Sequence, residues 1–144
     1  MSRTNEYAPS PTGWVRSQVE TIEQTGDTRS VHILDLPVVL LTMRGAKTGK
    51  IRKVPLMRVE HDGQYVVVGS DGGDPSHPQW VHNLDANPDI ELQDGTESWP
   101  VRARRIEADE RAEWWVRAVE AYPPYADYQR KTDRVIPLFR LDPR

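Results

Sequence analysis

The chain has 144 residues, a formal net charge of −3 and no cysteine; it suits one domain with its own core and excludes disulfides, iron–sulfur clusters and thiolate metal sites. A slightly acidic chain does not favour nucleic-acid binding. The sequence shows no apolar run that could span a bilayer and no apolar leader, so we expect a cytoplasmic protein and leave peripheral membrane contact open.

The first predicted elements are an arm and a helix. Residues 1–12 are polar and contain two prolines, so we expect a flexible N-terminal arm followed by a single domain over residues 13–144. Apolar residues recur at helical spacing from Gly13 onward, and Gly26 is a natural end for that helix.

Short strands and helices follow, separated by turn dipeptides such as Asp62-Gly63 and Asp94-Gly95. Runs of apolar and β-branched residues predict about six strands, at 38–42, 54–61, 65–69, 90–93, 98–107 and 135–141. Helical patterns are predicted at 79–86, at 107–121 and just before residue 131. Along the second of these, Ala112, Trp115, Val119 and Tyr122 share one apolar face. This content indicates a mainly β protein with flanking helices (α+β), closer to a small barrel than to a doubly wound sheet.

The segment RGAKTGKIRK, residues 44–53, is the most informative local pattern and reads as a turn. It gathers five cations without an acid, in a chain that is acidic overall. Gly45 and Gly49 allow backbone N–H groups to turn toward an anion, and Thr48 adds a hydroxyl. The pattern predicts a cradle for phosphate or carboxylate groups, and a solvated hairpin turn is the competing interpretation. Neither a Walker A spacing nor a GxGxxG fingerprint is present, so ATP and NAD are poor candidates.

Two further features carry possible chemistry. Gly72 and Gly73 directly follow a strand and allow close backbone approach to a flat ligand, and Trp80 and Asn83 share one face of the next helix. The alternative is an ordinary loop followed by a core tryptophan.

Three tyrosines spaced by three, Tyr122, Tyr125 and Tyr128, predict either core packing or an aromatic pocket wall with a proton donor. His77 and His82 lack a metal-ligand spacing, so no metal site is predicted.

These features occur in an order that resembles the deazaflavin (coenzyme F420)-dependent nitroreductase family, also described as F420H2-dependent quinone reductases. The matching stretches are LLTMRGAKTGKIRKVPL, VVVGSDGGDPSHPQWVHNLDANP and YPPYADYQRKTDRVIPL. The resemblance implies a split β-barrel related to the FMN-binding barrels, with reduced coenzyme F420 held in a cleft.

The resemblance also implies roles for individual residues. The residues matched to the phosphate and polyglutamate tail are Lys47, Thr48, Gly49 and Arg52. Those matched to the deazaflavin and its side chain are Pro55, Ser70, Asp71, Gly72, Gly73, Gln79, Trp80 and Asn83. Those matched to the substrate wall are Met57, Tyr122, Tyr125 and Tyr128, with Tyr125 and Tyr128 as the candidate proton donors.

Three positions depart from the family's nitroimidazole-activating member. Ala46 stands where that protein has Arg, Met57 where it has Tyr, and Asp71 where it has Lys. The first change removes a cation from the tail site, and the other two alter the pocket.

The expected activity is hydride transfer from the reduced deazaflavin to an electron-poor small molecule: a quinone, enone, unsaturated lactone or nitro compound. Two alternatives stay open at this point, an FMN-dependent oxidoreductase of the same barrel class and a non-enzymatic binding module for anionic or lipid-like ligands. Either a monomer or a homodimer is compatible with the sequence.

Overall fold

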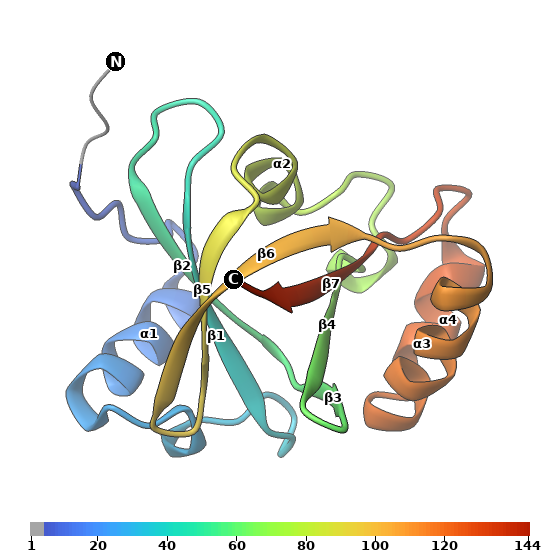
Figure 1. Cartoon of the computed structure of the whole chain (residues 1–144), viewed down its shortest axis with the longest axis horizontal. Helices are drawn as coiled ribbons and strands as arrows, with labels where there is room; N and C mark the ends of the chain where they lie inside the picture. The colour runs from blue at the N-terminus through green and yellow to red at the C-terminus, as the bar shows by residue number, and fades with distance from the viewer. Residues whose placement is uncertain (1–4) are drawn as a thin grey trace.

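The computed structural model describes residues 5–144, and its seven strands form one curled antiparallel sheet (Figure 1). The strands are β1 (Val38–Arg44), β2 (Ile51–Met57), β3 (Val59–His61), β4 (Gln64–Val68), β5 (Asp89–Asp94), β6 (Glu97–Arg105) and β7 (Leu138–Pro143). The helices are α1 (Gly13–Thr25), α2 (Gln79–Ala86), α3 (Ala108–Ala121) and α4 (Pro124–Lys131), with short 3₁₀ turns η1 (Thr28–Ser30) and η2 (Asp71–Gly73). The predicted mainly β architecture with flanking helices is confirmed.

A break at Arg58 curls the sheet into a half-barrel. The sheet order is β2-β1-β5-β6-β7-β4-β3, so the two edge strands are consecutive in sequence and only Arg58 separates them. The Arg58 N–H donates to the Pro37 carbonyl at 3.1 Å, and its side-chain Nε donates to Asp94 at 2.9 Å. Because Arg58 leaves the ladder, the single strand predicted over 54–61 is wrong, and two strands pair with opposite ends of the sheet.

Two other predicted boundaries are also wrong. Residues 51–53 were expected in a turn but extend β2 along β1, so the turn itself is residues 45–50. The last strand was expected from residue 135 but begins at Leu138. The Ile136 N–H donates to the Gln129 side chain and Pro137 has no N–H, so neither residue donates to β4 and the ladder begins at Leu138.

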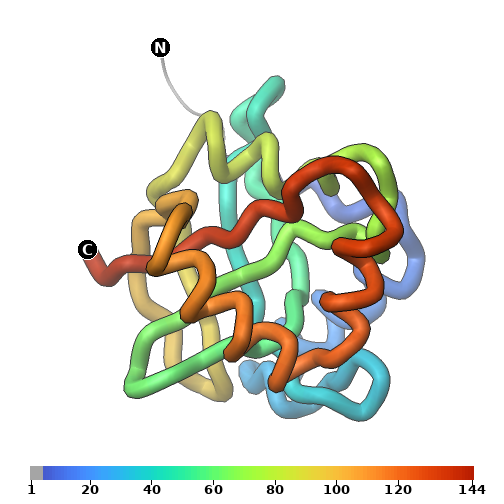
Figure 2. Tube along the Cα trace, turned by 90° about the vertical axis from the view of Figure 1, so that its right-hand side faces the viewer, coloured from blue at the N-terminus to red at the C-terminus, as the bar shows by residue number. Residues whose placement is uncertain are grey.

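Side chains alternate between three buried clusters because strand residues point to opposite faces. On β1, Val38 and Leu40 pack against α1, whereas Val39 and Leu41 face the barrel interior with Trp80 of α2. A third cluster joins α3 and α4 to the outer face of β3 and β4. Figure 2 shows these two helices side by side on that face. No helix within residues 5–144 is both long and apolar enough to cross a bilayer.

Candidate functional site

A cavity of about 620 Å³ lies along β2, and we call it the β2 pocket. Its volume is within the range of small-molecule sites. Most residues proposed from the sequence line it: Arg52, Pro55, Met57, Ser70, Asp71, Gly72, Gln79, Trp80, Asn83, Tyr122, Tyr125 and Tyr128. The remaining four, Lys47, Thr48, Gly49 and Gly73, do not. Five lining residues that sequence reasoning missed come from the arm and the start of α1: Ser10, Pro11, Thr12, Trp14 and Val15.

The pocket is elongated, since every residue of β2 from Arg52 to Met57 lines it. At the strand rise of about 3.3 Å per residue, five steps span about 17 Å. Met57 shares a buried cluster with Tyr122 and Tyr125, so the tyrosines lie at one end and Arg52 at the other. The site therefore has a cationic end and an aromatic end.

Arg52 is held at the cationic end by the arm. Its Nη1 donates to the carbonyls of Ala8 at 3.1 Å and Pro9 at 3.2 Å. Its Nε and Nη2 have no hydrogen-bond partner in the described part of the chain, so they are free to bind an anion. By contrast, Lys53 is paired with Glu23 of α1 and Lys50 with Glu6 of the arm. Two of the five cations predicted as an anion cradle are therefore already neutralised.

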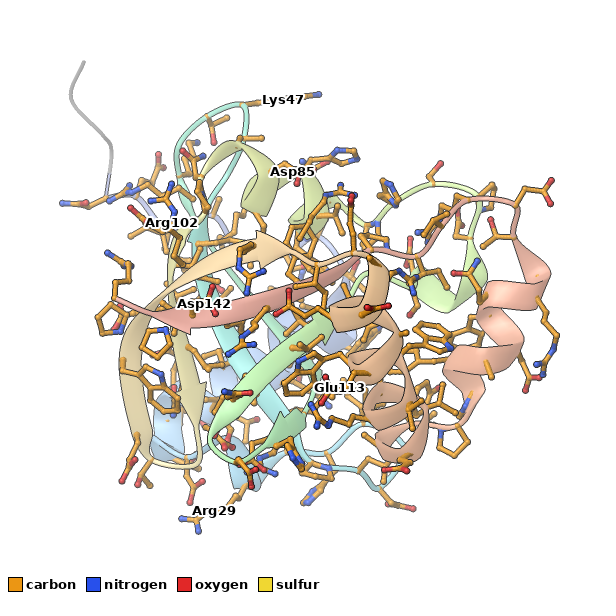
Figure 3. All side chains as sticks on the ribbon, turned by 45° about the vertical axis from the view of Figure 1, so that its right-hand side comes forward. Arg29, Lys47, Asp85, Arg102, Glu113 and Asp142 are labelled. Atoms are coloured by element: carbon orange, nitrogen blue, oxygen red, sulfur yellow. The ribbon has the colours of Figure 1, made fainter. Side chains whose placement is uncertain are left out.

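The turn between β1 and β2 is closed by three hydrogen bonds among its own residues. The Gly45 N–H donates to the Lys50 carbonyl at 2.8 Å, and the Gly49 N–H donates to the Gly45 carbonyl at 3.0 Å. The Thr48 hydroxyl accepts the Lys50 N–H at 3.2 Å. The two glycine N–H groups thus close the turn rather than point toward a ligand. Lys47 extends from the tip, away from the sheet (Figure 3).

Asn83 fixes this turn to α2. Only 4% exposed, it accepts the Ala46 N–H at 2.9 Å through its Oδ1. One helical turn later, the Asn87 Nδ2 donates to the Gly45 carbonyl at 3.4 Å. The predicted hydrogen-bonding role of Asn83 is thus directed at the protein backbone. Asn87 is not among the site residues predicted from the sequence. Its spacing of four residues from Asn83, which places both side chains on one face of α2, could have indicated this shared role.

The glycines of η2 serve two different purposes. Gly73, at φ +79°, meets α4 so closely that an added Cβ would lie 2.9 Å from the Tyr128 carbonyl oxygen. Gly72, at φ +63°, lines the pocket and has open space where a Cβ would be. The backbone at Gly72 is therefore the part of this loop that a ligand could approach closely. Gly73 instead lets the loop pack against α4.

Arg134 holds the loop between β4 and α2. Its Nη1 donates to the Gly69 carbonyl at 3.0 Å and to His77 Nδ1 at 2.8 Å. Its Nη2 donates to the Ser70 carbonyl at 2.6 Å, and its Nε donates to the Asp74 carbonyl at 2.7 Å. No role is predicted for Arg134 from the sequence, because three of its four partners are backbone carbonyls about 60 positions away.

The three tyrosines form one cluster where α3 meets α4. The ring centroids of Tyr122 and Tyr125 are 4.8 Å apart, and the hydroxyls of Tyr122 and Tyr128 share a hydrogen bond of 2.8 Å. The Tyr125 hydroxyl has no partner within residues 5–144, although the side chain is 5% exposed and lines the pocket. These rings are therefore both core and pocket wall, so the two interpretations of the pattern hold together.

Burial keeps the phenols of Tyr122 and Tyr125 protonated. Burial, followed by the hydrogen bond to Tyr128, raises the pKa of Tyr122 to about 12. Burial, followed by repulsion from the neighbouring phenolates, raises the pKa of Tyr125 well above its usual range. A raised phenol pKa stabilises the neutral form, so the Tyr122 and Tyr125 hydroxyls keep their protons and can donate hydrogen bonds near neutral pH. Within the described residues, no group of three or more acidic or histidine side chains is placed to hold a metal.

Solved structures of low identity share this fold. Over 90% of each chain, the structure superposes on the heme storage protein HutZ from Vibrio cholerae with a TM-score of 0.56 at 16% identity. An FAD-binding protein from Mesorhizobium loti gives 0.51 at 15% identity, over 74% of this chain and 80% of that one. A pyridoxinephosphate oxidase family protein from Clostridium acetobutylicum gives 0.52 at 16%, over 88% of this chain and 84% of that one. These neighbours agree with the split barrel that the sequence resemblance implied.

Relatives of higher identity point to one family. The model of the F420H(2)-dependent quinone reductase family matches residues 14–143. A putative F420H(2)-dependent quinone reductase of Mycobacterium tuberculosis (strain ATCC 25618 / H37Rv) is 40% identical over 76% of this chain and 92% of its own length. A solved F420-H2 dependent reductase is 57% identical, covers 78% of this chain and 99% of its own, and has a TM-score of 0.70. The chain therefore belongs to the F420H(2)-dependent quinone reductase family, a family of F420-dependent oxidoreductases.

Proposed function

We propose that this protein uses reduced coenzyme F420 to reduce a quinone or a similar electron-poor small molecule. The observation that carries the proposal is the elongated β2 pocket, which joins a cationic end at Arg52 to a tyrosine end at Tyr125. Enones, unsaturated lactones and nitro compounds share the electron-poor character of quinones and belong to the same proposal. Family membership supports the cofactor more directly than it supports any one acceptor.

The residues present fit a planar ring with an acidic tail. Arg52 offers uncommitted N–H donors at one end, and Lys47 projects at the tip of the adjacent turn. Between the ends, the pocket is lined by Pro55, Trp80 and the open face of Gly72. We infer that Arg52 and Lys47 hold the tail and that the ring lies between β2 and η2. When bound, the reduced coenzyme supplies the hydride.

The tyrosine end would then hold the acceptor. A quinone that receives a hydride needs a proton on its carbonyl oxygen, and a hydrogen bond to that oxygen stabilises the developing charge. Tyr125 has a hydroxyl without a partner in the described residues, whereas those of Tyr122 and Tyr128 are hydrogen-bonded to each other. We infer that Tyr125 donates first and that the Tyr122–Tyr128 pair orients it through ring contacts.

Changing Tyr125 and Tyr128 together to Phe is expected to lower kcat about 100-fold, a typical loss for a general acid. Coenzyme affinity is expected to change little, because the tail site is at the other end of the pocket. Since burial raises the pKa of Tyr125 and keeps its phenol neutral, wild-type kcat is expected to stay level from neutral pH to about pH 10. Steady-state rates and coenzyme binding measure both expectations.

Tyr7→Phe is the control, since it removes a phenol hydroxyl outside the pocket; it should change kcat by no more than about 2-fold. An unchanged rate in the double variant would remove both tyrosines from the proton transfer.

The cofactor proposal is tested by separate fluorescence titrations with coenzyme F420 and with FMN. We expect saturable F420 binding and weaker FMN binding. Arg52→Gln is expected to weaken F420 about 10-fold or more, the size of one lost charge-assisted contact. Arg102→Gln is the matched control, because Arg102 is an exposed arginine outside the pocket that pairs with Asp89. Tight FMN binding with no F420 binding would favour the FMN-dependent alternative.

The same preparation separates an enzyme from a binding module. An enzyme oxidises F420H2 in the presence of a quinone, whereas a binding module takes up ligand and oxidises nothing.

We also propose a homodimer, because one solved relative, at 57% identity and a TM-score of 0.73, is described as a domain-swapped dimer. That structure covers 92% of this chain and all of its own. Light scattering after size exclusion measures the mass.

A further inference from the structure

One end of the β2 pocket carries an isolated negative charge. Of the described residues that line the pocket, Asp71 is the acidic one. No cation within residues 5–144 forms an ion pair with its carboxylate. The lining cations, Arg52 and Lys53, belong to the first residues of β2, at the opposite end from Met57 and the tyrosines.

The position of Asp71 is fixed by its neighbours. Its φ is +44°, a left-handed conformation that few residues with a Cβ adopt. The residue before it is held by Arg134 through the Ser70 carbonyl, and Gly73 abuts α4 at Tyr128. The backbone at Asp71 is therefore held in a loop that packs against α4 at Tyr128.

Two cations lie behind this loop, and both are directed at its backbone. Lys131 Nζ donates to the Gly72 carbonyl at 3.5 Å, and Arg134 donates to the Ser70 carbonyl. Neither lines the pocket, so Asp71 is the charged residue of this loop that lines the pocket wall.

We propose that Asp71 selects the acceptor by charge, so that neutral or cationic rings enter the tyrosine end and anionic rings are rejected. This rests on the proposed function, and it assigns the substrate class of the same pocket: uncharged, electron-poor rings. Coulomb's law at an effective dielectric constant of about 20–40 and a separation of about 7 Å gives a discrimination of about 10- to 50-fold.

The test compares two quinones of the same ring size, neutral 2-methyl-1,4-naphthoquinone and anionic 1,4-naphthoquinone-2-sulfonate. The measured quantity is the ratio of their kcat/KM values with F420H2. Because intrinsic reactivity of each quinone is the same for every variant, a change in the ratio reports the protein. We expect Asp71→Asn to shift the ratio about 10-fold or more toward the sulfonate, and Asp71→Lys to shift it further. High salt should weaken the preference.

Asn is nearly isosteric with Asp and tolerates a positive φ, so the first variant should fold. Glu120→Gln is the control, because it removes one negative charge from an exposed α3 residue outside the pocket, and it should leave the ratio unchanged. A ratio that Asp71→Asn does not move, or that Glu120→Gln moves equally, overturns the proposal. The proposal is also overturned if Asp71→Asn raises coenzyme affinity but leaves the ratio of the two kcat/KM values unchanged.

A second readout needs no turnover. Calorimetric titration of each quinone into the cofactor-free protein should show the same preference for the neutral ring and its loss in Asp71→Asn. If the wild type oxidises no F420H2 with the neutral quinone, the proposed function fails. The titration then still decides whether Asp71 selects by charge, and equal affinity for the two rings in the wild type overturns that selection.

Discussion

Replacing Gly73 by Ala is expected to lower the free energy of unfolding by about 3 kcal/mol and to abolish most of the activity. At φ +79° an added Cβ costs about 1–2 kcal/mol, and overlap with a packed neighbour typically costs about 1–3 kcal/mol more. The neighbour is the Tyr128 carbonyl oxygen of α4, at 2.9 Å from the added atom, and backbone cannot rotate away as a side chain can. Because α4 carries Tyr125 and Tyr128, its displacement should disturb the pocket wall. Urea unfolding and steady-state kinetics measure the two effects.

Gly72→Ala is the matched control for this change. Gly72 has nearly the same backbone conformation, at φ +63°, but nothing lies within 4 Å of the added Cβ. Only the conformational cost of about 1–2 kcal/mol is then expected. Equal destabilisation by the two substitutions would show that packing against α4 contributes nothing at Gly73.

Local pattern predicted the type of most elements, because alternation and turn residues act within a few positions. The boundaries that failed depend on distant partners. Arg58 interrupts the strand expected over 54–61 because Asp94 and the Pro37 carbonyl bind it, and neither partner is visible in the local pattern. The buried face of α3 is a similar case. Helical spacing predicts a buried face of Ala112, Trp115, Val119 and Tyr122. Tyr122 is buried, but within α3 the buried residues are Trp114 and Ala118, since the helix is rotated onto β3 and β4.

In the candidate site, too, some features were predictable from the sequence and others depend on the fold. The residue types were predictable, since a pocket for a planar anionic ligand needs cations, glycines and aromatic rings. Which groups remain free for a ligand was not. Lys50 and Lys53 are paired with Glu6 and Glu23 from elements whose position only the fold determines. The same holds for the arm, which supplies part of the pocket wall although its sequence has no pattern to suggest it.

The second large effect is expected at Arg134. Arg134→Ala removes the donor to three loop carbonyls and to His77, and we expect a loss of about 2–4 kcal/mol in unfolding free energy. Amide exchange over residues 69–77 should rise, and kcat/KM should fall because Ser70 and Asp71 lose their fixed positions. Arg134→Lys should retain only part of the stability and of kcat/KM, since an ammonium lacks the planar fork that reaches several acceptors.

Arg130→Ala is the control for this variant, because Arg130 is an α4 arginine whose ion pair with Asp127 is largely exposed; a change within about 0.5 kcal/mol is expected. If Arg134→Ala left amide exchange in the loop unchanged, the residue would not be holding it.

His77 gives Arg134 a pH-dependent signature. A guanidinium can only donate, so His77 Nδ1 must accept and the imidazole must be neutral. Burial, followed by the charge of Arg134, lowers the pKa of His77 below its usual 6.5. The unfolded chain therefore binds this proton more readily, so the stabilisation is complete above about pH 6.5 and is lost as the pH falls through the lower folded value. Arg134→Ala removes one of the two main causes, so its unfolding free energy should fall less steeply over that window. Identical pH profiles for the two proteins would mean that His77 is held neutral by burial alone.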